Sequence, residues 1–211
     1  TFGICSFNKV KTFQIVDFGF QQILRSNLKS QISNLKMFTG IIEATGTVLS
    51  LKKEKGNLLL WIEASFVDEL KINQSIAHNG ACLSVADILD DRYVVVAVEE
   101  TLQKTNLGEV KEGGKINLER SMLLNTRLDG HLVQGHVDQT GICTNIIPLP
   151  ASPKGRGIPG SWIFTFEYTS GKENLVIEKG SICVNGISLT AINVNEKSFS
   201  VSVIPYTFQH T

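Results

Sequence analysis

The stretch SIAHNGACLSVADILDDRYVVVAVEETLQKT, residues 75–105, returns in altered form as SICVNGISLTAINVNEKSFSVSVIPYTFQHT, residues 181–211. The two stretches align from end to end without a gap, and nine of their positions are identical. A second match precedes the first, because GIIEATGTV (40–48) aligns with GHVDQTGIC (135–143) in the same order. Two matches in one order indicate an internal duplication, which is the first feature to seek in a new sequence.

Each copy has the pattern of a short all-β unit. Apolar and β-branched residues alternate, or run together over strand lengths, in TGTVLSL, LLLWIEA, CLSVADIL, YVVVAVE and KINLER of the first copy. Lys-Gly-Asn, Asn-Gly, Asp-Asp-Arg and Gly-Gly separate these runs and are typical turn residues. The Ser-capped stretch at 65–70 predicts one short helix. Short, regularly spaced strands favour a small closed barrel, since closure removes exposed edges.

The duplication predicts two barrels in tandem, at residues 37–133 and 134–211. The second copy contains an additional Pro-, Gly- and Ser-rich stretch at 146–161, which we interpret as an inserted loop. In the first copy, residues 106–122 supply a further turn and strand, whereas the second copy reaches only Thr211. We therefore expect the second barrel to be incomplete at its C-terminal end, unless another segment fills the gap.

Residues 1–36 differ from the rest of the chain. They carry five basic residues and one acid, and Met37 begins the pattern described above. The composition fits a transit peptide, an upstream translation artefact or a non-native tail, and we expect this segment to be disordered or partly helical.

Composition limits the classes of function. Of the 211 residues, 42% are hydrophobic and 19% are charged, which is enough to bury a core. The formal net charge is zero, which gives no general electrostatic attraction to nucleic acid or to an anionic membrane. The four cysteines are scattered and form neither a disulfide framework nor a zinc motif, so a reducing cytosol is the simpler interpretation.

Differences between the copies point to candidate ligand-binding groups. Cys82 aligns with Ser188, and both are small groups that can hydrogen-bond a polar ligand or attack it. Cys82 alone could equally be a buried structural residue, but a core position seldom prefers the hydroxyl of Ser188. His136 aligns with Ile41 and could serve as a general base, because imidazole titrates near neutral pH. His131 lies five residues away from His136, which argues against a zinc pair on one strand.

The motifs together resemble the α-chain type of riboflavin synthase. MFTGIIEATGTV, SIAHNGACLSV, ETLQKTNLGEVKEGGKINLERSM, DGHLVQGHVD and VNGISLT carry the resemblance, which covers residues 37–211. It implies two homologous closed six-stranded Greek-key barrels and, for a full-length chain, a homotrimer. It also implies a dismutation without metal or cofactor, in which two 6,7-dimethyl-8-ribityllumazine molecules yield riboflavin and 5-amino-6-(D-ribitylamino)uracil.

The resemblance also transfers site residues to this chain. It implies that His136, Cys82 and Ser188 assist catalysis and that Phe38 stacks near the pteridine. The first lumazine site would comprise Gly40, Ile41, Ile42, Cys82, Leu83, Ser84 and the strand Val96, Ala97, Val98, Glu99, Glu100, Thr101. The second would comprise Gly135, His136, Val137, Lys179, Ser188, Leu189, Thr190 and the strand Val203, Ile204, Pro205, Tyr206, Thr207, Phe208.

A non-catalytic lumazine- or flavin-binding protein is the alternative function. For either function we expect a small-molecule ligand, no nucleic acid and no membrane partner, and for the enzyme an association with lumazine synthase. The expected location is cytoplasmic, or plastid if residues 1–36 are a true transit peptide.

Overall fold

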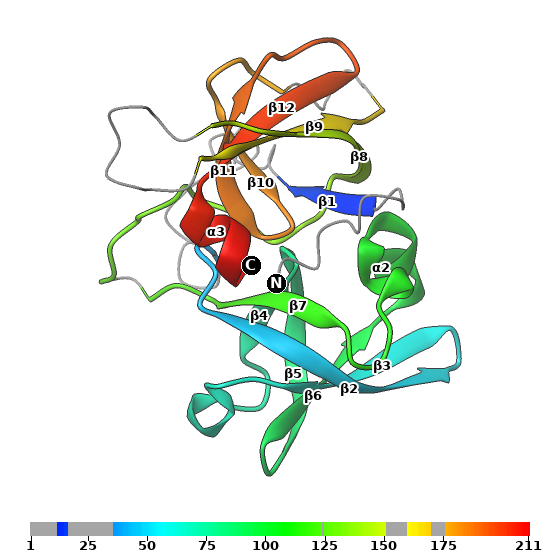
Figure 1. Ribbon diagram of the computed structural model, residues 1–211. Coiled ribbons are helices and arrows are strands. Elements are labelled where there is room, and N and C mark those ends of the chain that lie inside the picture. The colour runs from blue at the N-terminus through cyan, green and yellow to red at the C-terminus, as the bar shows by residue number, and fades with distance from the viewer. Residues whose placement is uncertain (1–11, 17–35, 124, 151–159, 170–175) are drawn as a thin grey trace, which may run out of the picture.

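The computed structural model describes residues 12–16, 36–123, 125–150, 160–169 and 176–211 of the chain. Its strands form two closed barrels, one above the other in Figure 1. The predicted all-β class with two six-stranded barrels is therefore confirmed. Of the segment 1–36, which we expected to be disordered or partly helical, the structure describes residues 12–16 and Lys36.

The first barrel contains six antiparallel strands from one continuous part of the chain. They are β2 (Ala44–Glu54), β3 (Asn57–Glu63), β4 (Ser75–His78), β5 (Ala81–Leu89), β6 (Arg92–Ala97) and β7 (Lys115–Arg120). Their order around the barrel is β2-β3-β6-β5-β4-β7. Leu58, Leu60 and Ile62 of β3 point inward and are buried, as the period of two along a strand requires. The short helix expected at 65–70 is the 3₁₀ helix η2 (Val67–Glu69).

The second barrel repeats this topology with a strand from elsewhere in the chain. Its strands are β1 (Thr12–Val16), β8 (Gln139–Pro148), β9 (Trp162–Glu167), β10 (Ser181–Val184), β11 (Ile187–Ile192) and β12 (Ser198–Val203). Their order is β1-β10-β11-β12-β9-β8, in which β1 takes the place of β7. Four aromatic rings, including Phe164 and Phe199, pack in a core with Ile15.

The structure differs here from the expectation of an incomplete second barrel. Residues 12–16, within the segment treated as a leader or tail, pair antiparallel with both β8 and β10 and close the barrel. Phe13 and Ile15 are buried, so this strand also has the apolar face that the gap requires. The sequence comparison missed it because the strand precedes both copies instead of following the second.

Both predicted site strands end earlier than expected. β6 stops at Ala97 and is followed by the helix α2 (Glu99–Lys104), and β12 stops at Val203 before the helix α3 (Pro205–His210). Acidic Glu99 and Glu100 in the first turn of α2, and Pro205 in the first turn of α3, favour helix starts. The expected strands over 96–101 and 203–208 are therefore wrong beyond Ala97 and Val203.

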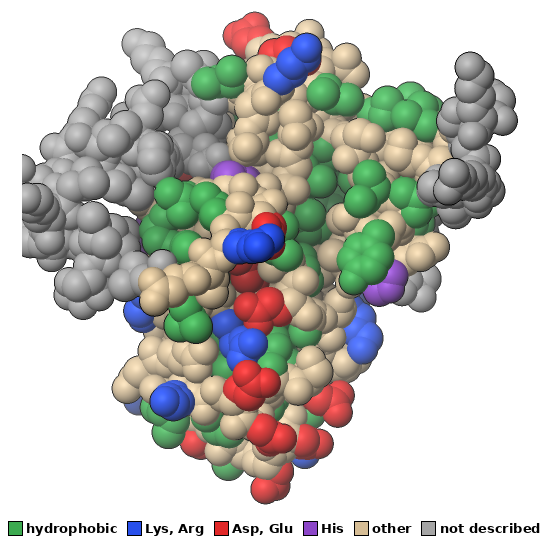
Figure 2. All heavy atoms as spheres, turned by 90° about the vertical axis from the view of Figure 1, so that its left-hand side faces the viewer, with side chains coloured by type: hydrophobic (Ala, Val, Ile, Leu, Met, Phe, Trp, Pro, Cys, Tyr) green, Lys and Arg blue, Asp and Glu red, His purple; other side chains and the backbone are tan. Residues whose placement is uncertain are grey.

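Charged side chains of both signs are interspersed over the first barrel, on the face shown in Figure 2. None of the helices in the described part of the chain is long and apolar enough to cross a membrane. The helix α3 approaches the first barrel, where the Thr45 hydroxyl donates to the carbonyl oxygen of His210 at 2.9 Å.

Candidate functional site

Two backbone crossings connect the barrels at matching positions. The amide of Ser188 on β11 donates to the carbonyl oxygen of Gly40 at 2.7 Å, and the amide of Cys82 on β5 donates to that of Gly135 at 2.8 Å. Gly40 precedes β2 of the first barrel, and Gly135 precedes β8 of the second. Each barrel thus receives the N-terminal arm of the other, and the two crossings are related by the duplication.

Glycine is required at both crossings. Gly40 and Gly135 have φ values of +74° and +77°, in the left-handed region. A Cβ atom on Gly40 would lie 2.7 Å from the Cβ of Ser188, and one on Gly135 would lie 2.7 Å from the Cβ of Cys82. A side chain at either glycine would therefore push the arm away from the strand that it crosses.

Glu119 on β7 holds the first arm. Its Oε1 accepts from the backbone amide and, at 2.7 Å, from the hydroxyl of Thr39, and its Oε2 accepts from the Gly40 amide at 2.9 Å. Burial raises the pKa of this carboxyl, and the hydrogen bonds from Thr39 and Gly40 oppose the shift. Sequence reasoning missed Glu119 because the duplication supplies no aligned acid, and KINLER was treated only as a strand.

Phe38 anchors the same arm in the protein core. It pairs with Val133 through two backbone hydrogen bonds of 2.7 and 2.9 Å. Its side chain is fully buried beside Ala77 and Cys183, between the barrels. The expectation that Phe38 stacks near a pteridine is therefore wrong in this structure, because the ring has no exposed surface.

Ser188 is paired with a histidine. The Nδ1 atom of His131 lies 2.7 Å from the Ser188 Oγ, and the His131 backbone amide donates to Thr39. Ser188 is half-buried, so its hydroxyl is held by the protein but open on one side. Sequence analysis assigned no role to His131. The motif DGHLVQGHVD could have pointed to His131. Its Gly130, directly before the histidine, passes so close to Thr39 that no other residue fits.

Cys82 occupies the matching place in the first barrel as a half-buried free thiol. Burial raises its pKa, and the Ser75 hydroxyl and the Lys36 ammonium oppose this shift. The thiol is consequently protonated at neutral pH and suits hydrogen bonding better than attack. Ser84, two residues along β5, is exposed and accepts from the Lys36 ammonium at 3.3 Å.

Comparison with known proteins shows which family this chain belongs to. The sequence matches the lumazine binding domain family over residues 39–121 and again over 134–211. The chain belongs to the lumazine-binding domain family.

Relatives with this domain are named riboflavin synthase. That of Actinobacillus pleuropneumoniae is 37% identical over 176 residues, covering 83% of this chain and 78% of that protein. That of Mycobacterium tuberculosis is 38% identical over 181 residues, covering 83% of this chain and 85% of that protein. Crystal structures of LumP complexed with 6,7-dimethyl-8-(1'-D-ribityl)lumazine and with riboflavin share the fold, with TM-scores of 0.67 and 0.69. Both are at most 17% identical, and each alignment covers 82% of this chain and 90% of LumP.

The contacts at the crossings group the predicted residues differently from our expectation. We grouped Gly40, Ile41 and Ile42 with Cys82, whereas Gly40 contacts Ser188 of the other barrel. We grouped Gly135, His136 and Val137 with Ser188, whereas Gly135 contacts Cys82. The arms are exchanged because each runs across the partner barrel before it enters its own.

Some predicted residues do not lie on the side of the strand that carries Cys82 and Ser188. Leu83 is buried in the first core, and Leu189 packs against the second, because side chains alternate along a strand. Ala97 and Val203 are also core residues. Besides Cys82, Ser188 and Leu189, the predicted site residues that are at least partly exposed are Ile41, Ile42, Ser84, Val96, Val98, Glu99, Glu100, Thr101, His136, Val137, Lys179, Thr190, Ile204, Pro205, Tyr206, Thr207 and Phe208.

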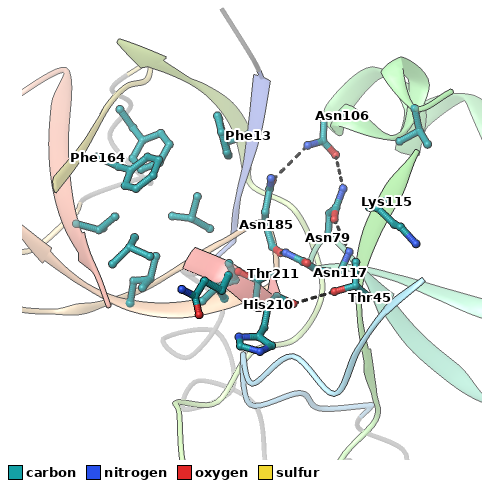
Figure 3. A pocket seen from close by; sticks show the side chains of 18 of the residues that line it. Phe13, Thr45, Asn79, Asn106, Lys115, Asn117, Phe164, Asn185, His210 and Thr211 are labelled. Atoms are coloured by element: carbon teal, nitrogen blue, oxygen red, sulfur yellow. Dashed lines mark hydrogen bonds between the residues drawn. The ribbon is translucent and has the colours of Figure 1, made fainter. Parts of the chain in front are cut away.

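A cavity lies away from both crossings. It measures about 600 Å³ and extends from the interior of the second barrel to the polar groups between the barrels, as Figure 3 shows. Phe13 and Phe164 line its apolar part, and Asn106 and Asn185 its polar part. Neither Cys82 nor Ser188 lines it, although Leu189 and Val203 do. We place the candidate lumazine sites at the crossings because the duplicated polar groups lie there.

Proposed function

We propose that this chain is a riboflavin synthase that converts two 6,7-dimethyl-8-ribityllumazine molecules into riboflavin and 5-amino-6-(D-ribitylamino)uracil. The observation that carries the proposal is the pair of matched crossings, with Cys82 beside Gly135 and Ser188 beside Gly40. Two like sites suit a reaction in which donor and acceptor are the same compound. The relatives named riboflavin synthase, at 37–38% identity, support this choice.

The proposed arrangement brings two lumazines face to face. One lies at the first barrel beside Cys82, and the other lies at the second barrel beside Ser188 of a neighbouring copy in a homotrimer. Holding both rings in a reactive geometry makes the encounter effectively intramolecular. Such positioning is worth about 7–11 kcal/mol of the barrier.

We assign proton transfer to Ser188 and His131. The 7-methyl group of one lumazine must lose a proton before its carbon can attack the other molecule. The Ser188 Oγ takes that proton as its own proton passes to the His131 Nδ1, which lies 2.7 Å away. The methyl carbon keeps the electron pair and becomes the nucleophile, and the His131 imidazolium gives its added proton to a product later in the cycle, which regenerates the neutral imidazole.

The first site has complementary chemistry in this proposal. The protonated thiol of Cys82 donates a hydrogen bond to the bound lumazine, which then accepts a water or hydroxyl nucleophile. His136, exposed and adjacent in sequence to Gly135, serves as the proton carrier at this side. The reaction as proposed is a group transfer between two identical substrates.

Turnover of the pure lumazine tests the proposal directly. The full chain is incubated with 6,7-dimethyl-8-ribityllumazine, and riboflavin and the ribitylaminouracil are quantified by chromatography. We expect the products in equal amounts. Ser188→Ala should reduce the rate at least about 100-fold, because general acid–base groups contribute at this scale. The matched control is Ser65→Ala, which removes an exposed hydroxyl from the first barrel, outside both crossings.

The same assay separates the enzyme from the non-catalytic alternative. A binding protein would hold lumazine without producing riboflavin, and that outcome would contradict the proposed activity. We further propose a homotrimer associated with lumazine synthase, to be tested by light scattering and co-purification. We propose a cytoplasmic location, which is consistent with the free Cys82 thiol, and not a plastid one, because removal of residues 1–36 as a transit peptide would take β1 from the second barrel.

A further inference from the structure

The strand β1 reproduces the pairing of β7 at the level of single hydrogen bonds. In the first barrel, Asn79 donates its amide to the Asn117 carbonyl at 2.8 Å, and its Oδ1 accepts from the Asn117 amide at 2.9 Å. In the second barrel, Asn185 makes the same two bonds with Gln14, at 3.0 and 2.9 Å. Gln14 therefore performs for the second Asn-Gly turn what Asn117 performs for the first.

Side chains of β1 also complete the second barrel. Phe13 and Ile15 retain only 3% and 1% of their accessible surface, and both pack in the second core. Phe13 points into the cavity in Figure 3, and Gln14 is fully buried, with its Nε2 donating to the Oδ1 of Asn106 in the first barrel. One face of the strand thus fills the barrel, while the other face reaches the neighbouring barrel.

The strand β1 is distant in sequence from the other strands of its barrel. All six strands of the first barrel, from β2 to β7, lie in sequence between β1 and β8. The pairing with β8 covers four residue pairs, and that with β10 covers two. The strand is therefore held by local pairing and side-chain burial, as an added strand is held at a sheet edge.

The turn that Gln14 holds lies directly before Ser188. Asn185 has φ +50° and Gly186 φ +83°, as in an Asn-Gly hairpin turn, and the two hydrogen bonds between Asn185 and Gln14 tie this turn to β1. Ser188 is the second residue of β11, which starts at this turn. Loss of β1 would leave the edges of β8 and β10 unpaired and the turn without its partners.

We propose that the gap between β8 and β10 is a strand-binding site whose resident ligand is the chain's own segment 12–16. Its occupation shapes the second crossing at Ser188, and Gln14 is the positioning residue. The part that concerns lumazine rests on the proposed function, whereas the part that concerns strand binding does not.

The test uses the full chain with Gln14→Pro, because proline lacks the N–H that the Asn185 Oδ1 accepts. Amide hydrogen exchange is measured at Asn185 and, as an internal control, at Asn79 of the first barrel. We expect protection at Asn185 to fall at least about tenfold, with little change at Asn79. Added peptide KVKTFQIVDF, residues 9–18, should restore protection at Asn185, whereas the same peptide with Gln14→Pro should not.

Lumazine titration is the second readout. The variant should lose the site at Ser188 and keep that at Cys82, and the wild-type peptide should restore the lost site. Unchanged protection at Asn185 in the variant, or failure of the wild-type peptide to restore it while Asn79 stays protected, would overturn strand binding. If protection at Asn185 is lost in the variant and restored by the peptide as expected, but no form of the protein binds lumazine, the proposed function is contradicted and strand binding stands. Restored protection without restored lumazine binding, with the Cys82 site occupied, would reject the positioning role of Gln14.

Discussion

His78 and Tyr93 form a buried polar pair whose counterparts in the second barrel are apolar. The Nδ1 of His78 lies 3.0 Å from the Ile76 carbonyl oxygen, so this nitrogen carries the proton and donates it. Its Nε2 then accepts from the Tyr93 hydroxyl at 2.9 Å. The duplication aligns His78 with Val184 and Tyr93 with Phe199, both of which are buried. The aligned residues Val184 and Phe199 therefore show which apolar side chains can replace His78 and Tyr93 together.

The pair makes stability dependent on pH. Burial lowers the pKa of His78 from 6.5 to about 4, so between these values the unfolded chain binds a proton that the folded chain does not. Stability therefore falls as the pH drops from 6.5 to about 4 and is unaffected by His78 above 6.5. At about 1.4 kcal/mol for each pKa unit, the loss amounts to about 3 kcal/mol.

The substitutions His78→Val and Tyr93→Phe, alone and together, test this reasoning. Each single variant leaves one buried polar group without its partner and should lose about 1–3 kcal/mol at pH 7. The double variant recreates the apolar pair of the second barrel, so it should be more stable than the sum of the two single losses predicts, by about 1–2 kcal/mol.

Urea unfolding at pH 7, 5.5 and 4.5 measures both effects. The decisive quantity is the difference between wild type and the double variant, because the other titrating groups are common to both. That difference should shift by about 2 to 3 kcal/mol in favour of the double variant as the pH falls. An unchanged difference across this range would show that the pKa of His78 is not depressed, and strict additivity at pH 7 would show that the pair is not coupled.

Three further outcomes are expected. Gly135→Ala places a Cβ 2.7 Å from that of Cys82, so riboflavin formation should fall at least about tenfold while far-ultraviolet circular dichroism stays unchanged; normal turnover would show that the arm need not cross there. Glu119→Gln presents an amide N–H₂ to donors on the Thr39 arm and should cost about 1–3 kcal/mol in urea unfolding, in contrast to Glu63→Gln on the exposed end of β3. Leu107→Ala empties a fully buried position in the first barrel and should cost about 2–5 kcal/mol by the same measurement, and a smaller loss would mean that the barrel collapses around the gap.

The barrels could be predicted because each copy of the duplication carries its own evidence. Alternating apolar residues, Asn-Gly turns and a gap-free alignment indicate local strands, and β8, β10, β11 and β12 of the second barrel lie wholly or partly in the aligned stretches 135–143 and 181–211. The strand β1 could not be found in this way. TFQIV is too short to be distinctive, and its place is defined by long-range pairing with β8 and β10, which a local pattern does not reveal.

The candidate site shows the same division between local and long-range information. Cys82 and Ser188 could be singled out because their aligned positions keep a small polar group, but an alignment of two copies says which residues are equivalent and not which residues touch. Gly40 is equivalent to Gly135, yet each contacts the barrel to which the other leads. The glycines themselves indicate close backbone approach, since both need a positive φ and neither has room for a Cβ. The sequence does not show which strand each glycine approaches, because that depends on long-range contacts such as the pairing of Phe38 with Val133, two residues before Gly40 and Gly135.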